Sequence, residues 1–221
     1  METTFTSATT QSPCAKSGDT VMFFDVETTG LPTRYDAPYS RVDVWPRIVS
    51  VCWAFYTTAG DELQHDYAIV KPNGFLIPDE AALIHGITTE RALQEGTPLK
   101  SVLNKMTADI QLHRPLLAVA HNIRFDEPVL HAEFLRCMLP RPLVRMRKFC
   151  TMSTTTELCR LRPRRQGKFK WPKLVELHRH LFGTEFSAGH HAGADVKACA
   201  ECFFELQRTS VAGPWKYTFQ S

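Results

Sequence analysis

The sequence predicts an α/β fold with a mixed β-sheet flanked by helices on both faces. Three strand-like segments open the chain, and helical and strand-like segments alternate after them. This order is typical of helices packed on a mixed sheet. A hydrophobic content of 43% in 221 residues is sufficient for such a core in one domain.

The first three strands are predicted from apolar runs and a turn. Residues 21–26 (VMFFDV) are short, apolar and rich in strand formers, as in a strand buried on both faces. Residues 47–58 (RIVSVCWAFYTT) predict a second strand. Residues 62–70 return after Ala59-Gly60-Asp61 as the second arm of a hairpin.

Prolines mark the starts of the next two helices. Pro78 precedes the short helical segment DEAALIHG, and Thr97-Pro98 fit the N-cap and N1 positions of a longer helix. The apolar face of that longer helix consists of Leu99, Val102, Leu103, Met106 and Ile110.

A buried strand, LLAVA, follows Pro115 and leads into a further helix. Because Pro128 is tolerated only in the first turn, we expect this helix to begin near Phe125 or Asp126 and to end near Leu139.

The C-terminal third predicts a short strand around Phe149, a helix over residues 171–182 stopped by Gly183, and a final amphipathic helix. The apolar stripe of the final helix consists of Val196, Cys199, Ala200, Phe203 and Leu206. Cys199 and Cys202 are expected in its core face, and His178 and His180 at the surface.

The composition favours a soluble, intracellular protein with one domain over residues 20–210. Residues 1–19 are expected to be a disordered tail and residues 211–221 a C-terminal tail. Seven cysteines without the spacing of a disulfide scaffold favour a reducing compartment. No apolar run approaches the ~20 residues of a membrane span, and we expect no membrane partner.

Two carboxylates, Asp25 and Glu27, lie two residues apart at the end of the first strand. Side chains of a strand alternate between faces, so both project to one side, where open α/β sheets place ligands. Two adjacent acids repel unless a cation neutralises them, which indicates a site for a hard metal ion. The alternative is a solvated strand end.

Two further motifs supply acids. Asp126 lies in HNIRFDE, where a buried strand passes into a helix; a simple helix cap is the alternative interpretation. Asp195 lies in GHHAGADV at the start of the final helix, five residues after His190 and four after His191. Either histidine alone could be an ordinary loop residue.

Taken together, four acids and a histidine can hold two divalent ions roughly 4 Å apart for phosphodiester hydrolysis. One ion activates water and the other stabilises the leaving oxygen. A histidine with an ordinary pKa of about 6.5 can accept the proton of the attacking water.

These motifs resemble those of the DEDDh-type 3'-5' exonucleases of the DnaQ-like, ribonuclease H-like superfamily, similar to the proofreading subunit of bacterial replicative polymerases. The resemblance rests on FDVETTGLP, AHNIRFDEPVL and HHAGADV, in the order of the family, and covers roughly residues 21–208. The segments IHGIT and KWPKLVELHRHLFG are also similar to family members.

The resemblance implies a ribonuclease H-like mixed sheet and a metal-dependent 3'-5' exonuclease that releases nucleoside monophosphates from single-stranded 3' ends of DNA or RNA. The implied cofactors are two Mg²⁺ ions, with Mn²⁺ as a substitute, and a DNA polymerase is a candidate partner. The implied metal ligands and catalytic acids are Asp25, Glu27, Asp126 and Asp195.

The resemblance also implies a general base and substrate contacts. The histidine subtype places its base five residues before the last Asp, which selects His190, whereas the tyrosine subtype uses the position of His191. Residues implied to lie near the terminal nucleotide are Thr28, Leu31, His85 and Asn122. The loop over residues 32–45 is longer than in compact members, so the approach to the site is expected to differ.

Residues 160–173 (RLRPRRQGKFKWPK) combine seven basic residues with Phe169 and Trp171. Such a run can neutralise phosphates, and exposed rings can stack on unpaired bases. The alternative is a solvated loop whose Trp171 packs into the core. Two functional alternatives to an enzyme are a non-catalytic nucleic-acid-binding module and a polymerase accessory subunit of the same fold.

Overall fold

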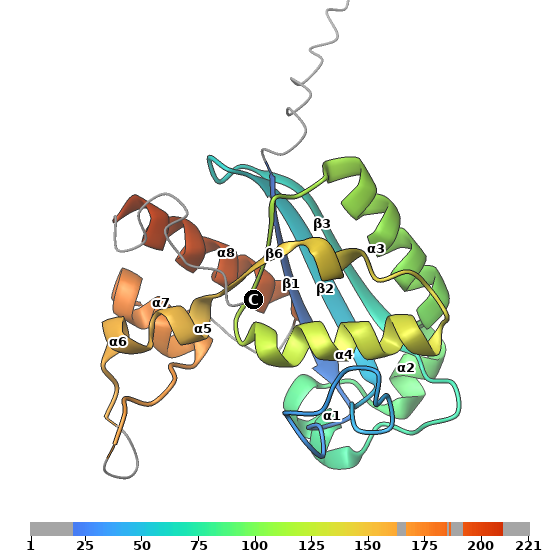
Figure 1. The fold of residues 1–221 in the computed structure, drawn as a ribbon. Helices are drawn as coiled ribbons and strands as arrows, with labels where there is room; N and C mark the ends of the chain where they lie inside the picture. Colours follow the sequence, from blue (N-terminus) through green and yellow to red (C-terminus); the bar gives the residue numbers. More distant parts are fainter. Residues whose placement is uncertain (1–19, 163–166, 185, 187–191, 210–221) are drawn as a thin grey trace, which may run out of the picture.

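A computed structural model of the chain describes residues 20–162, 167–184, 186 and 192–209, and it has the predicted α/β architecture (Figure 1). The strands are β1 (Thr20–Thr28), β2 (Ile48–Thr57), β3 (Glu62–Lys71), β4 (Thr97–Pro98), β5 (Leu117–Ala120) and β6 (Arg147–Cys150). They form one sheet in the order β4-β3-β2-β1-β5-β6.

The helices alternate with the later strands, as the sequence predicts. They are α1 (Asp79–His85), α2 (Thr89–Glu95), α3 (Leu99–His113), α4 (Ile123–Arg136), the 3₁₀-helix η1 (Pro142–Arg145), α5 (Thr151–Thr154), α6 (Thr156–Cys159), α7 (Leu174–Phe182) and α8 (Ala192–Arg208). None of the helices in the described ranges has the length and apolarity that a membrane-spanning segment requires.

The sheet is mixed. β2 and β3 are added on one side of β1, and β5 and β6 on the other, so the strand order reverses at β1. β1, β2 and β3 form an antiparallel meander, whereas β5 runs parallel to β1 and β6 parallel to β5. Ligands of open α/β sheets bind at the carboxyl ends of the strands beside such a reversal. For this chain the position is the C-terminal end of β1.

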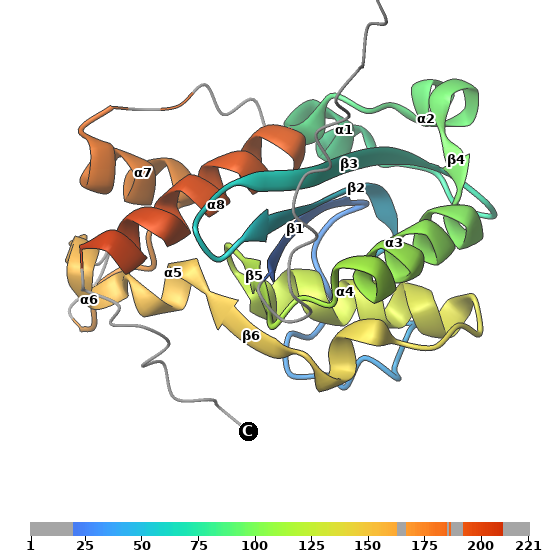
Figure 2. The same ribbon diagram turned by 90° about the horizontal axis from the view of Figure 1, so that it is seen from above.

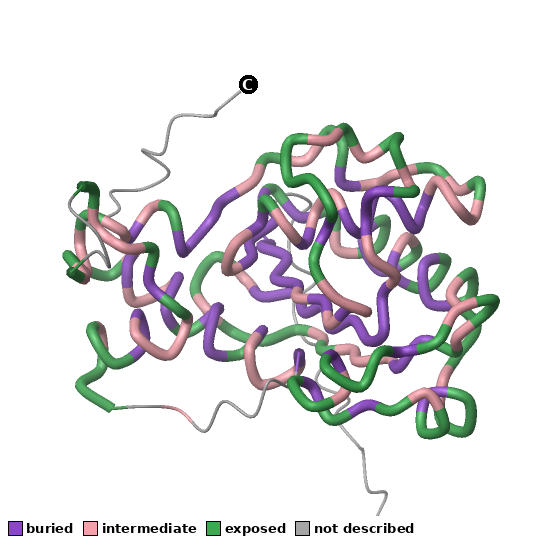
Figure 3. Tube along the Cα trace, turned by 90° about the horizontal axis from the view of Figure 1, so that it is seen from below, coloured by how far each residue is buried: buried purple, intermediate pink, exposed green. Residues whose placement is uncertain are grey.

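Helices cover both faces of the sheet (Figure 2). Phe24 and Val26 of β1 lie in a core with α3 and α4, and Phe23 lies in a second core with Val196 and Phe203 of α8. Odd and even positions of β1 therefore face opposite helix layers. A third, smaller cluster packs α1 and α2 against β2 and β3. In Figure 3 many of the buried residues gather at the centre of the trace, and exposed residues lie mainly at its periphery.

Several predicted helix boundaries are wrong. α4 begins at Ile123 because Asn122 takes the left-handed conformation (φ 79°) and turns the chain directly into the helix. Pro128 therefore lies in its second turn, and α4 ends at Arg136 rather than near Leu139. The predicted 171–182 helix begins only at Leu174.

Other differences concern pairing and burial. Thr97 and Pro98 pair with the end of β3 as β4, so Pro98 rather than Thr97 is the N-cap of α3, and the helix begins at Leu99. His178 is buried, not at the surface; its Nδ1 lies 2.9 Å from the Thr184 carbonyl oxygen. The short helices α2, α5 and α6 were not predicted.

The C-terminal predictions are confirmed elsewhere. α7 ends at Gly183, which takes the left-handed conformation with φ 73°. Cys199 and Cys202 are buried in the core face of α8, and all six cysteines among the described residues are free.

Candidate active site

The end of β1 places Asp25 and Glu27 on one side of the sheet. Both share the face of Phe23, which packs against α8, because strand positions alternate. Their neighbours Phe24 and Val26 are buried on the opposite face. The two carboxylates are therefore half-buried and directed to the α8 side.

α8 adds a third carboxylate from its first turn. One oxygen each from Asp25, Glu27 and Asp195 lies within 4.8 Å of the others. Oxygen-rich clusters of this kind suit hard divalent cations such as Mg²⁺ and Mn²⁺. The three residues could therefore hold a metal ion.

The fourth predicted acid, Asp126, approaches β1 along the edge that pairs with β5. β5 pairs with β1 only as far as Phe23, so the following part of β1 has no strand on that edge. There the Val26 amide donates to Asp126 Oδ1 at 3.3 Å. Asp126 is thus buried between the positions of Asp25 and Glu27, and the structure brings all four acids to one end of β1.

The carboxylates raise one another's pKa. Burial, followed by repulsion from Asp126, Glu27 and Asp195, raises the pKa of Asp25 well above its usual range. Burial, followed by repulsion from Asp195, raises the pKa of Glu27 to about 7. Burial also raises the pKa of Asp126, although the Val26 amide opposes this shift. Clustered acids with raised pKa values gain most from a bound cation, so the donor set fits a metal.

A hollow of about 460 Å³ lies beside Glu27. Thr28, Leu31 and His85, three of the four residues expected near a terminal nucleotide, line it. Leu31 is 73% exposed, and such a large exposed apolar side chain is available to contact a base.

His85 has a defined tautomer at this hollow. Its Nδ1 accepts a hydrogen bond from the Ile87 amide at 3.2 Å, so Nε2 carries the proton. Burial lowers the pKa of His85, and the Thr28 carbonyl partly offsets this. Nε2 makes no hydrogen bond of normal geometry with the described residues. The ring is therefore neutral, and its buried Nε2–H faces the Thr28 carbonyl rather than the open hollow.

Asn122 does not line this hollow. Its left-handed conformation starts α4, which is a sufficient structural reason for asparagine at this position. The proposed base His190 and its alternative His191 lie outside the described residues.

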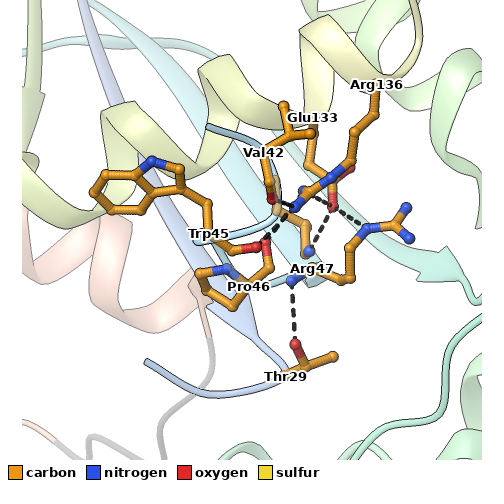
Figure 4. A network of polar contacts seen from close by, with 8 residues as sticks. Thr29, Val42, Trp45, Pro46, Arg47, Glu133 and Arg136 are labelled. Carbon is orange, nitrogen blue, oxygen red and sulfur yellow. Dashed lines mark hydrogen bonds and ion pairs between the residues drawn. The ribbon is translucent and has the colours of Figure 1, made fainter. Parts of the chain in front are cut away.

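The loop over residues 32–46 is fixed to α4 by a buried carboxylate (Figure 4). Glu133 is fully buried, and its Oε1 accepts from Arg47 Nε at 2.9 Å and from the Ile48 amide at 3.0 Å. Arg136 lies 3.2 Å from the same oxygen and donates to the Trp45 carbonyl at 2.7 Å. The long loop is thus held against α4.

A second segment beside the site carries Trp171. Half-buried His121 directly follows β5, with Nδ1 2.9 Å from Thr151 Oγ1 and Nε2 3.0 Å from the Pro172 carbonyl. Burial lowers the pKa of His121 to about 4, so the ring is neutral. Trp171, next to this anchor, is 57% exposed, which contradicts core packing of its ring.

A family comparison covers the part of the chain that carries these residues. The model of the RNase T exonucleases matches residues 22–203, which include all four acids and His190. The chain belongs to the RNase T exonuclease family. A search of the curated proteins finds no significant match.

Solved structures similar to this exonuclease domain are exonuclease I proteins. E. coli exonuclease I in a complex with single-stranded DNA superposes with a TM-score of 0.68 at 20% identity, over 88% of this chain and 42% of the other. Exonuclease I from Methylocaldum szegediense gives 0.69 at 19% identity, over 87% and 41%. The chain thus spans less than half of those proteins, and the likeness supports the ribonuclease H-like fold.

Some residues of this exonuclease site were not predicted from the sequence. Ile84 of α1 and Phe125 of α4 line the hollow beside Glu27. Ile84 is 58% exposed despite its apolar side chain. Its position next to His85 in IHGIT was an available signal, whereas the contribution of Phe125 depends on the actual start of α4.

Proposed function

We propose that this chain is a 3'-5' exonuclease that hydrolyses the terminal phosphodiester of single-stranded DNA or RNA and releases nucleoside monophosphates. The observation that carries the proposal is the convergence of Asp25, Glu27 and Asp195 within 4.8 Å. Asp126, on the other edge of β1, completes the set. The direction of degradation is that of the DnaQ-like exonucleases.

The four carboxylates would hold two divalent ions, Mg²⁺ or Mn²⁺. Bound there, the ions would supply a nucleophile from water and neutralise charge on the leaving oxygen. The carboxylates would hold the ions, and a histidine would take up a proton. His190 accepts the proton of the attacking water, as in the DEDDh subtype, and it sits in the segment that leads into α8.

The hollow beside Glu27 would hold the terminal nucleotide. Leu31, Ile84 and Phe125 offer apolar surface to the base, and the His85 ring forms part of the wall of the hollow. Thr28 lines the same hollow, and Asn122, outside it at the start of α4, is the remaining proposed substrate contact. E. coli exonuclease I binds single-stranded DNA in its solved complex, which supports a single-stranded substrate.

Digestion of end-labelled oligonucleotides tests this function. We expect wild-type protein with Mg²⁺ to shorten 5'-labelled single strands progressively and to release labelled mononucleotide at once from 3'-labelled strands. His190→Ala should lower the rate by about 10²- to 10⁴-fold, the usual contribution of a general base, while the matched variant His191→Ala retains activity. Binding without cleavage under all metal conditions would favour a non-catalytic module.

A further inference from the structure

A basic pocket of about 470 Å³ lies where the end of β3, the start of α3 and the end of α4 meet. Its lining consists of Arg47, Lys71, Pro72, Asn73, Pro98, Leu99, Lys100, Arg136 and Cys137. Four of these side chains are cationic, and none of the described lining residues is acidic. The pocket therefore has the composition of an anion site.

The charges are not neutralised equally. Arg136 donates to loop carbonyls and lies against buried Glu133, so groups inside the protein compensate its positive charge. Arg47 also contacts Glu133, but only through Nε. Lys71 and Lys100 are exposed, and neither ammonium group has a hydrogen bond or ion pair with a described residue. The pocket thus retains excess positive charge at its two lysines.

The start of α3 adds to the excess positive charge of the pocket. Lys100 lies in the first turn, where the helix dipole is positive and a lysine is unfavourable. No side chain caps this end, and the first turn contains no acidic residue. A negatively charged group bound beside Lys100 would offset the repulsion between this lysine and the positive end of the helix dipole.

The pocket adjoins the hydrolytic site through two hydrogen bonds between Thr29 and Arg47. The Thr29 amide donates to the Arg47 carbonyl at 2.9 Å, and the Arg47 amide donates to Thr29 Oγ1 at 3.1 Å. Thr29 lines the hollow beside Glu27, and Arg47 lines the basic pocket. The Arg47 guanidinium lies 4.4 Å from the ring centroid of Phe75, which keeps it oriented at this boundary.

We propose that the pocket formed by Arg47, Lys71 and Lys100 binds a backbone phosphate of the substrate strand on the 5' side of the cleaved bond. The inference rests on the proposed exonuclease function for the identity of the strand. The chemistry is sequence-independent, since lysine contacts to phosphate carry no base information. The pocket would hold a strand after each nucleotide is removed.

Salt-dependent binding tests the pocket without requiring cleavage. Fluorescence anisotropy of a labelled single-stranded oligonucleotide of about 16 nucleotides, in EDTA, is measured for wild type, Lys71→Gln and Lys100→Gln. Each variant should lower the slope of log affinity against log salt by about 0.7 and weaken binding about three- to tenfold. Lys197→Gln is the matched control, because Lys197 is an exposed lysine beside the β2–β3 turn, at the other end of the sheet.

A small substrate separates the two proposals. The p-nitrophenyl ester of thymidine 5'-monophosphate has no second phosphate to reach the pocket, so both lysine variants should hydrolyse it at the wild-type rate with Mg²⁺. Salt slopes equal to that of Lys197→Gln would overturn the phosphate site, as would an equal loss on the ester and the oligonucleotide. If wild-type protein cleaves neither substrate, the proposed function fails, while the salt slopes still decide whether the pocket binds a strand.

Discussion

Replacing Glu27 by glutamine should stabilise the metal-free protein although it removes a proposed metal ligand. Burial and the neighbouring Asp195 raise the pKa of Glu27 to about 7 from its ordinary value of 4.5. At about 1.4 kcal/mol per pKa unit, ionising this carboxyl in the folded state costs about 3 kcal/mol. Partial exposure of Glu27 reduces the expected effect to about 2 kcal/mol.

The sign and the pH window follow from the direction of the shift. Because the folded-state pKa is raised, the wild-type protein is relatively most stable below about pH 4.5 and loses this stability as the pH rises through 7. Glu27→Gln has no carboxyl group to ionise at this position, so it does not lose this stability as the pH rises. At pH 8.5 in EDTA its melting temperature should exceed that of wild type by about 4–8 °C, and at pH 4.5 the difference should vanish.

Thermal denaturation of both proteins at these two pH values, with and without Mg²⁺, is the assay. Mg²⁺ at about 100 times its Kd should stabilise wild type by about 2.7 kcal/mol and the variant by much less. A variant that is less stable than wild type in EDTA at pH 8.5 would refute the electrostatic reasoning, because Glu27 would then contribute favourable contacts rather than repulsion.

Three further substitutions test other parts of the structure. Glu133→Ala leaves two half-buried arginines without their shared, fully buried carboxylate and should destabilise the protein by about 3–5 kcal/mol in urea denaturation; a loss below 1 kcal/mol would contradict the role of this carboxylate. Gly96→Ala should destabilise by about 1–3 kcal/mol, because a Cβ atom would lie 2.7 Å from Lys71 Cα and collide with the Ala92 carbonyl; unchanged stability would show that the backbone moves freely there. Trp171→Ala should leave the melting temperature within about 2 °C of wild type, since the ring is exposed, but should weaken binding of a single-stranded oligonucleotide by about 1–3 kcal/mol in anisotropy titrations; equal affinity would exclude base stacking on this ring.

The sequence was sufficient to predict the parts of the site that depend on short-range geometry. Asp25 and Glu27 share a face because strand side chains alternate, and Asp195 joins them because α8 covers that face. These relations follow from one residue spacing and one amphipathic stripe. The alternating order of elements likewise predicted the mixed sheet.

Features that depend on long-range pairing were not predictable in the same way. Pro128 indicated a later start for α4, but the left-handed Asn122 begins that helix and overrides the usual preference for proline in the first turn. Lys71 and Lys100 lie 29 positions apart and form one pocket only because the end of β3 pairs with β4 immediately before α3. His178 is buried because Phe182 and Phe186 pack against its ring, a contact that no periodicity reveals.

The central claim is that the carboxylates at the end of β1 hydrolyse a nucleic acid strand with the help of divalent metal. The most direct measurement is gel-resolved digestion of one 5'-labelled single-stranded oligonucleotide by wild type and Asp25→Asn, each with Mg²⁺ and with EDTA. The account predicts a ladder that shortens from the 3' end only for wild type with Mg²⁺. Cleavage by Asp25→Asn at the wild-type rate, or undiminished cleavage in EDTA, would contradict it.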